Sequence, residues 1–293
     1  MSGRPSTDGA SFVVRTRNSA ATIEATLTSV RSQTIPAEIV IVDSGSTDET
    51  LRIAGPLSDR VVPIARTDFT YGRALNLGVE AATGGLVVAL SSHCTLPRQD
   101  WLELAADHFQ LSTLAAVSGF PLDSAGRLLS RARPVTWSDV EIDPGWGYSN
   151  HAGILRRSAW QRHPFDEQLI ACEDKEWMYR VMEDGWTVLV DPRLTVSTSH
   201  RRGAGFVSLY RRVYREHRVL AELLTYDAPG WGGLAAQWWS CLPPSSTRPA
   251  WQRRLSPWRA VELAGSWHGD RSGARRRHSA TGAVGIHRRA GQS

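Results

Sequence analysis

Four consecutive β-branched residues, Ile39 to Val42, constrain the fold more than any other stretch of the sequence. A strand without polar alternation is buried on both faces, as the strands of a parallel sheet are. The run ends at Asp43, and Gly45 then permits a tight turn into a helix. Because an open α/β sheet binds its ligand outside the carboxyl ends of its strands, Asp43 is expected to lie in the binding crevice. The alternative is a carboxylate that only caps its own turn.

Strand and helix patterns alternate along most of the chain. Apolar runs predict strands at 11–16, 39–43, 60–64, 86–90, 114–120, 150–155, 187–190 and 194–198. Helical spacing of apolar residues predicts helices at 23–33, 49–54, 74–82, 101–109, 173–183 and 206–220. Residues 121–149 carry less pattern and are expected to be irregular, with one hairpin. The alternation favours right-handed βαβ units, and therefore an α/β fold with a mostly parallel sheet flanked by helices.

Composition divides the chain into four segments. They are an N-terminal tail at 1–10, the α/β domain at 11–225, a Trp- and Arg-rich, partly helical extension at 226–269, and a disordered basic tail at 270–293. The net charge of +5 comes from the C-terminal end, because residues 251–293 hold nine Arg against Glu262 and Asp270. Such a segment has three interpretations: a solvated tail, a membrane-surface element in which Trp and Arg meet anionic headgroups, or a nucleic-acid-binding arm. Nucleic acid is the least favoured partner.

Targeting signals and cysteine motifs are missing from the sequence. No stretch of about 18 apolar residues predicts a transmembrane helix, and the N-terminus lacks the apolar run of a signal peptide. The three cysteines, Cys94, Cys172 and Cys241, share no close-spaced motif, which fits reduced thiols and disfavours a zinc site. We therefore expect a cytoplasmic protein, with peripheral contact at the inner face of the membrane as the alternative.

Polar clusters stand where the predicted strands or loops end. They are Asp43, Ser91 with His93, Glu173 with Asp174, and His200 with Arg201 and Arg202. Acids, histidines and arginines at one sheet edge suit a charged ligand, such as a diphosphate with or without a divalent cation. The sequence contains no G-x-G-x-x-G, no G-x-x-x-x-G-K-[ST] and no G-x-S-x-G, which excludes the commonest dinucleotide, P-loop and hydrolase sites.

In this order and spacing, the clusters and their flanking motifs resemble the inverting GT-A glycosyltransferases of family 2, over residues 10–225. The resemblance rests on five pieces: Val13–Asn18, Ile41–Asp48, Gly72–Gly78, Phe165–Glu167 with Glu173, Asp174 and Arg180, and His200 after a strand. It implies the GT-A fold, a Rossmann-like, mostly parallel sheet flanked by helices.

The resemblance also implies roles for the matching residues. The residues expected to contact the nucleotide-sugar donor are Thr16, Asp43, Arg73, Asn76, Ser91 and Arg201. Asp174 would be the general base that takes the proton of the acceptor hydroxyl, with Glu173 as the next candidate. Trp177, on the same side of the helix as Asp174, would form an apolar wall against an acceptor sugar. The alternative for Glu173 and Asp174 is an acidic helix start favoured by the helix dipole.

One motif departs from the family pattern. The family usually places Asp-x-Asp after the strand at 86–90, where this sequence has Ser91-Ser92-His93. Two alternatives follow. Either His93 and His200 together hold Mn²⁺ or Mg²⁺, or no metal is needed and Arg201 and Arg202 offset the diphosphate charge. A histidine at a strand end is also often structural.

The resemblance predicts a glycosyltransferase that moves a sugar from a nucleotide diphosphate donor to an acceptor hydroxyl with inversion, in polysaccharide or glycolipid synthesis. Its partners would be a nucleotide-sugar and a glycan or lipid-linked acceptor, and the pattern at 69–78 favours rhamnosyl transfer. One rival hypothesis is a sugar-nucleotide-binding protein without catalysis, suggested by the degraded Asp-x-Asp. The other, a nucleic-acid-binding module, rests only on the tail.

Overall fold

The computed structural model describes residues 9–122, 129–198, 205–224 and 257–279. They fall into two compact units. The first comprises residues 1–169 and 173–200, and the second comprises 170–172 and 201–293. Each unit is described by itself below.

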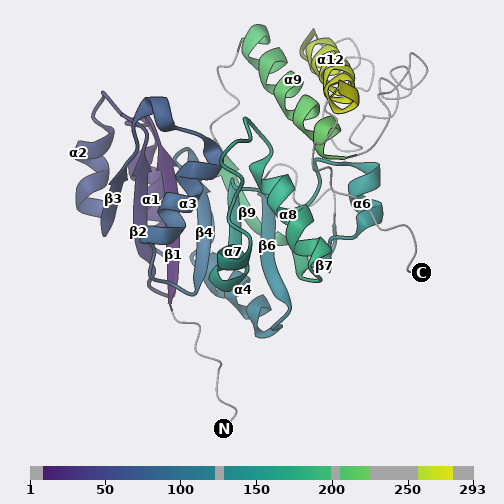
Figure 1. Cartoon of the computed structure of the whole chain (residues 1–293). Helices are drawn as coiled ribbons and strands as arrows, with labels where there is room; N and C mark the ends of the chain where they lie inside the picture. The colour runs from purple at the N-terminus through teal and green to yellow at the C-terminus, as the bar shows by residue number, and fades with distance from the viewer. Residues whose placement is uncertain (1–8, 123–128, 199–204, 225–256, 280–293) are drawn as a thin grey trace. The chain divides into compact units, whose positions relative to one another are not determined.

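The N-terminal half of the first unit is a parallel sheet built from βαβ units. Strands β1 (Ala10–Thr16), β2 (Glu38–Asp43), β3 (Arg60–Pro63) and β4 (Leu86–Ser91) lie in the order β3-β2-β1-β4, which can be followed in Figure 1. The connecting helices are α1 (Ile23–Arg31), α2 (Thr50–Ala54) and α3 (Tyr71–Ala81), with short 3₁₀ turns at Gly55–Leu57 and Arg66–Asp68. This half confirms the fold predicted from the apolar runs.

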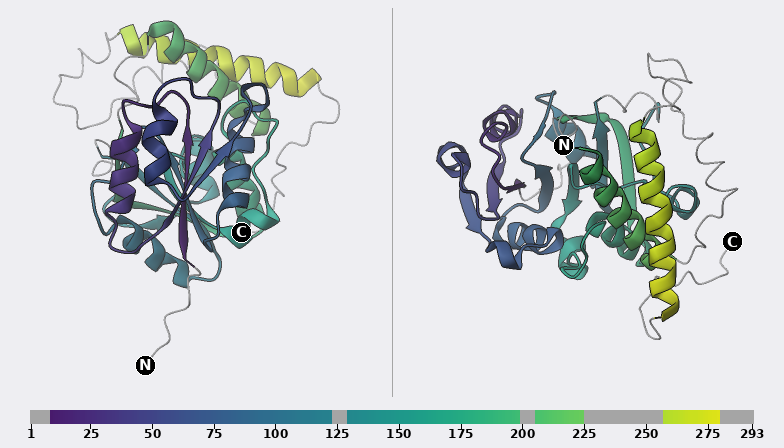
Figure 2. Two further views of the ribbon diagram at one scale, coloured as in Figure 1. Left: turned by 90° about the vertical axis from the view of Figure 1, so that its left-hand side faces the viewer. Right: turned by 90° about the horizontal axis from the view of Figure 1, so that it is seen from above.

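The C-terminal half of the sheet is mixed. Strand β8 (Ala152–Arg156) runs antiparallel to both of its neighbours, β4 and β6 (Leu114–Pro121), and β9 (Thr187–Thr198) is parallel to β6. Two short strands, β5 (Cys94–Thr95) and β7 (Arg133–Pro134), pair antiparallel with β9. From these pairings, six strands share one direction and β5, β7 and β8 oppose it. The sheet is therefore mostly parallel, and Figure 2 (left) shows its twist as a fan of strands.

Two local predictions in this half are wrong. The separate strands expected at 187–190 and 194–198 form the single strand β9, because β6 pairs with it on both sides of a register shift. The hairpin expected within 121–149 is replaced, in the described part of that segment, by β7 and helix α6 (Trp137–Ile142). Strand β7 finds its partner in β9, far along the chain, and not in its own segment.

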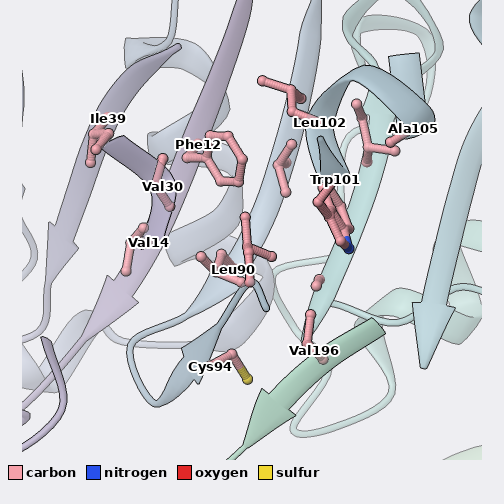
Figure 3. Close-up of a cluster of buried hydrophobic side chains, with 14 of the residues drawn as sticks. Phe12, Val14, Val30, Ile39, Leu90, Cys94, Trp101, Leu102, Ala105 and Val196 are labelled. Carbon is pink, nitrogen blue, oxygen red and sulfur yellow. The ribbon is translucent and has the colours of Figure 1, made fainter. Parts of the chain in front are cut away.

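Helices cover both faces of the sheet. On one face, helix α1 and helix α4 (Trp101–Asp107), which is followed by a 3₁₀ turn at His108–Gln110, pack side chains such as Val30 and Trp101 against Phe12 and Leu90 (Figure 3). On the other face lies α3, where a Cβ at Gly78 would stand 2.2 Å from a methyl of Val13. Helices α7 (Arg157–Arg162) and α8 (Glu173–Glu183) complete the unit.

Among its described residues, the second unit has the helices α9 (Phe206–Leu223) and α12 (Pro257–Ser279), which lie side by side (Figures 1 and 2). Glycines recur at every fourth residue of α12, at 265, 269 and 273, and so share one helix face. A Cβ at Gly269 would lie 2.6 Å from the carbonyl oxygen of Tyr214, which shows how closely this face approaches the α9 backbone. No helix in the described ranges is long and apolar enough to cross a membrane.

This helix pair corrects two expectations about the C-terminal region. Residues 270–279, expected to be disordered, continue α12, and α9 belongs to the second unit although the α/β domain was expected to extend to 225. Composition suggested disorder because apolar side chains are scarce there. In the structure, α12 is held against α9 by close packing at its glycines and by polar contacts, such as the 3.0 Å pair between His217 Nδ1 and Asp270 Oδ1.

Candidate active site

A cavity of about 340 Å³ opens at the carboxyl ends of β1, β2 and β4. We call it the edge cavity. It is lined by Arg15, Thr16, Arg17, Ser44, Arg66, Phe69, Tyr71, Ser91, Ser92 and His93. The parallel strands bring these residues together because their carboxyl ends meet at one edge of the sheet. Three guanidinium groups and no carboxylate belong to this lining, so the edge cavity suits an anionic ligand.

Thr16 is the residue of this lining whose side chain most clearly lacks a partner. It is 5% exposed, and its Oγ1 has no hydrogen-bond partner among the residues that the structure describes. Its backbone oxygen accepts hydrogen bonds from the Ser44 amide and hydroxyl, at 3.1 and 3.3 Å, which join the ends of β1 and β2. A buried hydroxyl without a partner costs about 1–3 kcal/mol, a cost that a bound polar ligand can remove.

Asp43, the residue on which the sequence analysis centres, holds its own turn together. Its Oδ2 accepts hydrogen bonds from the backbone amides of Gly45 and Ser46, at 3.1 and 3.0 Å, and its Oδ1 accepts one from the Ser46 hydroxyl. Gly45 has φ of +80°, the left-handed conformation that this turn requires. The carboxylate is 4% exposed, and its neighbour Ser44, not Asp43 itself, lines the edge cavity. The turn-capping alternative is thus present, and the contact with a donor stays a prediction.

Arg73 and Asn76, on α3, contact the segment 165–167 instead of the edge cavity. Asn76 Nδ2 donates to the Phe165 carbonyl and to Glu167 Oε1, both at 2.9 Å. Its Oδ1 accepts hydrogen bonds from Trp160 Nε1 at 2.9 Å and from the Phe165 amide at 3.0 Å. Arg73 lies 3.3 Å from Glu167 Oε2. The side-chain amide of Asn76 has therefore used both donors and its acceptor within the fold.

Arg15 connects the edge cavity with the start of α8. Its Nη1 lies 3.5 Å from Glu173 Oε1, and its Nη2 donates to the Asn150 carbonyl at 3.2 Å. Its guanidinium carbon also stands 5.6 Å from the centre of the Tyr71 ring. Arg15 and Arg17 lie within the motif Val13–Asn18, but neither they nor Arg66 were among the residues expected to contact the donor. Only the fold places these three arginines around one cavity.

The two predicted carboxylates differ in environment. Glu173 is 6% exposed and accepts a hydrogen bond from Asn150 Nδ2 at 3.1 Å. Burial raises the pKa of Glu173, the adjacent charge of Asp174 raises it further, and Arg15 opposes the shift. Asp174 is only half-buried, and its Oδ2 accepts from the Asn150 amide at 3.3 Å. Asp174 is therefore the more accessible of the two carboxylates.

Two aromatic residues near these carboxylates are part of the core. Trp177, expected to form an apolar wall against an acceptor sugar, is 0% exposed and donates from Nε1 to the His163 carbonyl at 2.7 Å. That expectation is wrong, because the side of α8 that carries Trp177 packs inward, with its ring centre 5.2 Å from that of Tyr148. Tyr148 is also 0% exposed, its hydroxyl has no partner within the described ranges, and burial raises its pKa.

The structure tests only half of the predicted metal pair. His93 lines the edge cavity, with its ring centre 6.4 Å from that of His151. His200, Arg201 and Arg202 lie outside the described residues, so the shared site of His93 and His200 stays a prediction. Within the described part of the chain, no three His, Cys, Asp or Glu side chains are grouped to hold a metal ion. Among the described lining residues, one imidazole stands beside three guanidiniums, and this set by itself does not fit a divalent cation.

Comparison with known proteins finds similarity to glycosyltransferases. Residues 11–154 match the family model described as "Glycosyl transferase family 2". The O-antigen chain rhamnosyltransferase RfbN of Salmonella typhimurium is 26% identical over 206 residues, which cover 64% of this chain and 66% of the relative. The PGL/p-HBAD biosynthesis glycosyltransferase Rv2957 of Mycobacterium tuberculosis is 39% identical over 101 residues, 33% of this chain and 40% of the relative. The chain thus spans two thirds or less of the curated relatives it matches.

Solved structures show the same fold. The mannosyltransferase PcManGT of Pyrobaculum calidifontis, in complex with GDP-Man and Mn²⁺, superposes with a TM-score of 0.63 at 19% identity, covering 92% of this chain and 86% of that one. TarS 1-349 of S. aureus, in complex with UDP-GlcNAc, gives a TM-score of 0.57 at 18% identity, with 90% and 91% covered. These likenesses confirm the fold predicted from the sequence.

Proposed function

Residues 11–154 belong to glycosyl transferase family 2 within a GT-A fold, and from this premise we propose that the protein is an inverting glycosyltransferase that uses a nucleotide diphosphate sugar. The observation that carries the proposal is the juxtaposition of a cationic cavity at the sheet edge with a carboxylate pair, joined by Arg15. The edge cavity would hold the donor, and Asp174, the more accessible carboxylate of the pair, would face the acceptor.

The donor would use both polar and apolar groups of the edge cavity. Phe69 and Tyr71, whose ring centres are 5.3 Å apart, offer aromatic surface for a nucleobase or ribose. Thr16 offers a buried hydroxyl without a partner, and Ser91 lies at the end of β4 in the same lining. The arginines suit the diphosphate, because guanidinium groups pair with phosphate oxygens in a bidentate way.

The acceptor would be activated by Asp174. The acceptor oxygen forms a bond to the anomeric carbon while the bond from that carbon to the diphosphate oxygen breaks, and Asp174 takes the hydroxyl proton. Attack from the face opposite the leaving group inverts the anomeric centre. Glu173, buried and held by Arg15 and Asn150, would act as a positioning residue for the pair. A positioned base of this kind contributes about 10²–10⁴-fold in rate.

Substrate identity and location belong to the same proposal. Two relatives carry the name O-antigen chain rhamnosyltransferase, which supports rhamnosyl transfer to a glycan or lipid-linked acceptor. Peripheral contact with the inner face of a membrane would come from the region 226–269. Near the end of this region, the centre of the Trp267 ring lies 4.4 Å from the guanidinium carbon of Arg271 in the following basic segment, a pairing of basic and aromatic groups suited to headgroups.

A second candidate function is favoured by the Ser91-Ser92-His93 departure: a protein that binds a sugar nucleotide without transferring the sugar. The two functions differ in their need for Asp174. We would screen UDP-, GDP- and dTDP-sugars by thermal shift, since a ligand that binds only the native state raises the melting temperature. Turnover with a stabilising donor would then be measured, and the anomeric configuration of the product determined by NMR. Stabilisation without turnover on any acceptor would favour the binding protein, and a retained configuration would contradict inversion.

A further inference from the structure

The charged residues that line the edge cavity are three arginines, and no carboxylate is among them. Arg15, Arg17 and Arg66 line it, and His93 is the single His, Cys, Asp or Glu residue of the lining. A divalent cation prefers carboxylate oxygens and is repelled by guanidinium groups at the same site. A diphosphate, in contrast, needs positive charge, which a metal ion or several arginines can supply.

Two of the three arginines are available for a ligand. Neither Arg17, directly after β1, nor Arg66, at the turn after β3, forms an ion pair or side-chain hydrogen bond with any described residue. Arg15 is different, because it is already paired with Glu173. The two unpaired guanidiniums come from separate connections of the sheet and reach the same cavity. This convergence distinguishes them from surface arginines that lie outside the edge cavity and pair with a neighbouring acid, such as Arg52 with Glu49.

A second, independent observation indicates that the cavity is built for a polar ligand. Thr16, which belongs to this lining, is 5% exposed, and its buried hydroxyl has no partner in the described part of the chain. The ligand that fits is therefore one that hydrogen bonds at Thr16 and carries negative charge within reach of Arg17 and Arg66.

We propose that Arg17 and Arg66, supported by Arg15, neutralise the donor's diphosphate directly, so that the site binds and uses its donor without a divalent cation. This inference rests on the proposed function. As the bond to the anomeric carbon breaks, negative charge grows on the diphosphate, and preorganised guanidinium groups would stabilise that charge. The arginines would thus take the place of the metal that an Asp-x-Asp motif would hold.

The test is calorimetric binding of UDP, GDP and dTDP to the full chain, with EDTA and separately with Mn²⁺. For the nucleotide that binds most tightly, we expect the two dissociation constants to agree within about threefold. Arg17→Gln and Arg66→Gln should each weaken binding in EDTA by about tenfold, because each removes a charge-assisted hydrogen bond. The same two substitutions should weaken the binding of the corresponding nucleoside monophosphate less, since it lacks the second phosphate. Arg52→Gln is the matched control and should leave both dissociation constants unchanged.

The outcomes separate the inference from the proposed function. Binding that appears only with Mn²⁺ would overturn the arginine proposal and leave the glycosyltransferase proposal standing. Full affinity in the double variant Arg17→Gln/Arg66→Gln would overturn it as well. No binding of any nucleotide under either condition would overturn both. Because Arg17 and Arg66 are exposed, the variants are expected to fold, and circular dichroism melting checks this.

Discussion

Arg15 and Glu173 are 158 residues apart in the sequence, and their side chains meet at 3.5 Å, with only 13% and 8% of their surfaces exposed. The contact joins the end of β1, beside the edge cavity, to the first turn of α8, beside Asp174. A mostly buried ion pair is sensitive to the removal of either partner, because the remaining charge is left without compensation. The two halves of the candidate site are therefore electrostatically linked.

The pH dependence of stability should report on Glu173. Its folded-state pKa is raised, first by burial and then by the charge of Asp174, so the native state binds a proton more tightly than the unfolded state. The stabilisation from this group is complete below the unfolded pKa and is lost as pH rises through the folded pKa. As pH rises above about 4.5, the free energy of unfolding should therefore fall in the native protein relative to Glu173→Gln, by at most about 1.4 kcal/mol per pH unit.

Urea titrations at steps of pH measure this difference. Glu80→Gln, which changes an exposed glutamate of α3, is the control and should follow the native protein at every pH. Parallel curves for Glu173→Gln and the native protein would show that Glu173 has no raised pKa.

Asp174 should separate catalysis from binding. Asp174→Asn keeps the shape of the side chain but removes the base, so donor affinity should persist while turnover falls by about 10²-fold or more. Glu173→Gln should reduce turnover less, since Glu173 is buried and does not face the acceptor. Calorimetry and initial rates with one donor measure the two effects. A native rate in Asp174→Asn would reject the assignment and make Glu173 the next residue to test.

Substitution of Asp43 should affect both the binding of the donor and the stability of the turn. We expect Asp43→Ala to weaken nucleotide binding several-fold and also to lower the melting temperature, because three hydrogen bonds within 43–46 are lost. Ser46→Ala is the matched control, since it removes the hydroxyl, with its contacts to Asp43 and to the Asn18 amide, and leaves the carboxylate in place. It should lower the melting temperature slightly at unchanged nucleotide affinity. If both variants lose stability equally and neither loses affinity, Asp43 serves only its turn.

Asn76 should behave as a structural residue. Asn76→Ala leaves buried partners such as Trp160 Nε1 and the Phe165 amide without hydrogen bonds, at about 1–3 kcal/mol for each group. Arg73→Ala, which removes an exposed ion pair with Glu167, should cost at most about 1 kcal/mol. Chemical denaturation compares the free energies of unfolding of the two variants, and calorimetry on the folded protein measures their nucleotide affinity. A large loss of affinity in Asn76→Ala at native stability would restore its predicted contact with the donor.

The sequence by itself determined the features that depend on near neighbours. The apolar run at Ile39–Val42 required a buried strand, and the hydrogen bonds that the Asp43 carboxylate accepts come from Gly45 and Ser46 in the turn that follows it. The motif order at 13–18, 41–48 and 72–78 was enough to predict the family. These signals are local, because periodicity, turn chemistry and motif spacing act within a few residues.

Only the tertiary structure decided which polar groups share a site. Arg15, Arg17 and Arg66 line one cavity because β1, β3 and their following turns end at one sheet edge, which no spacing in the sequence encodes. Asn76 is used within the fold because segment 165–167 reaches it from 89 residues away. Helix α12 forms despite its polar composition because its glycines pack closely on α9. In each case the contact joins residues that are far apart in the sequence. Such a contact contributes to stability only once folding has brought these residues together, so local sequence patterns do not reveal it.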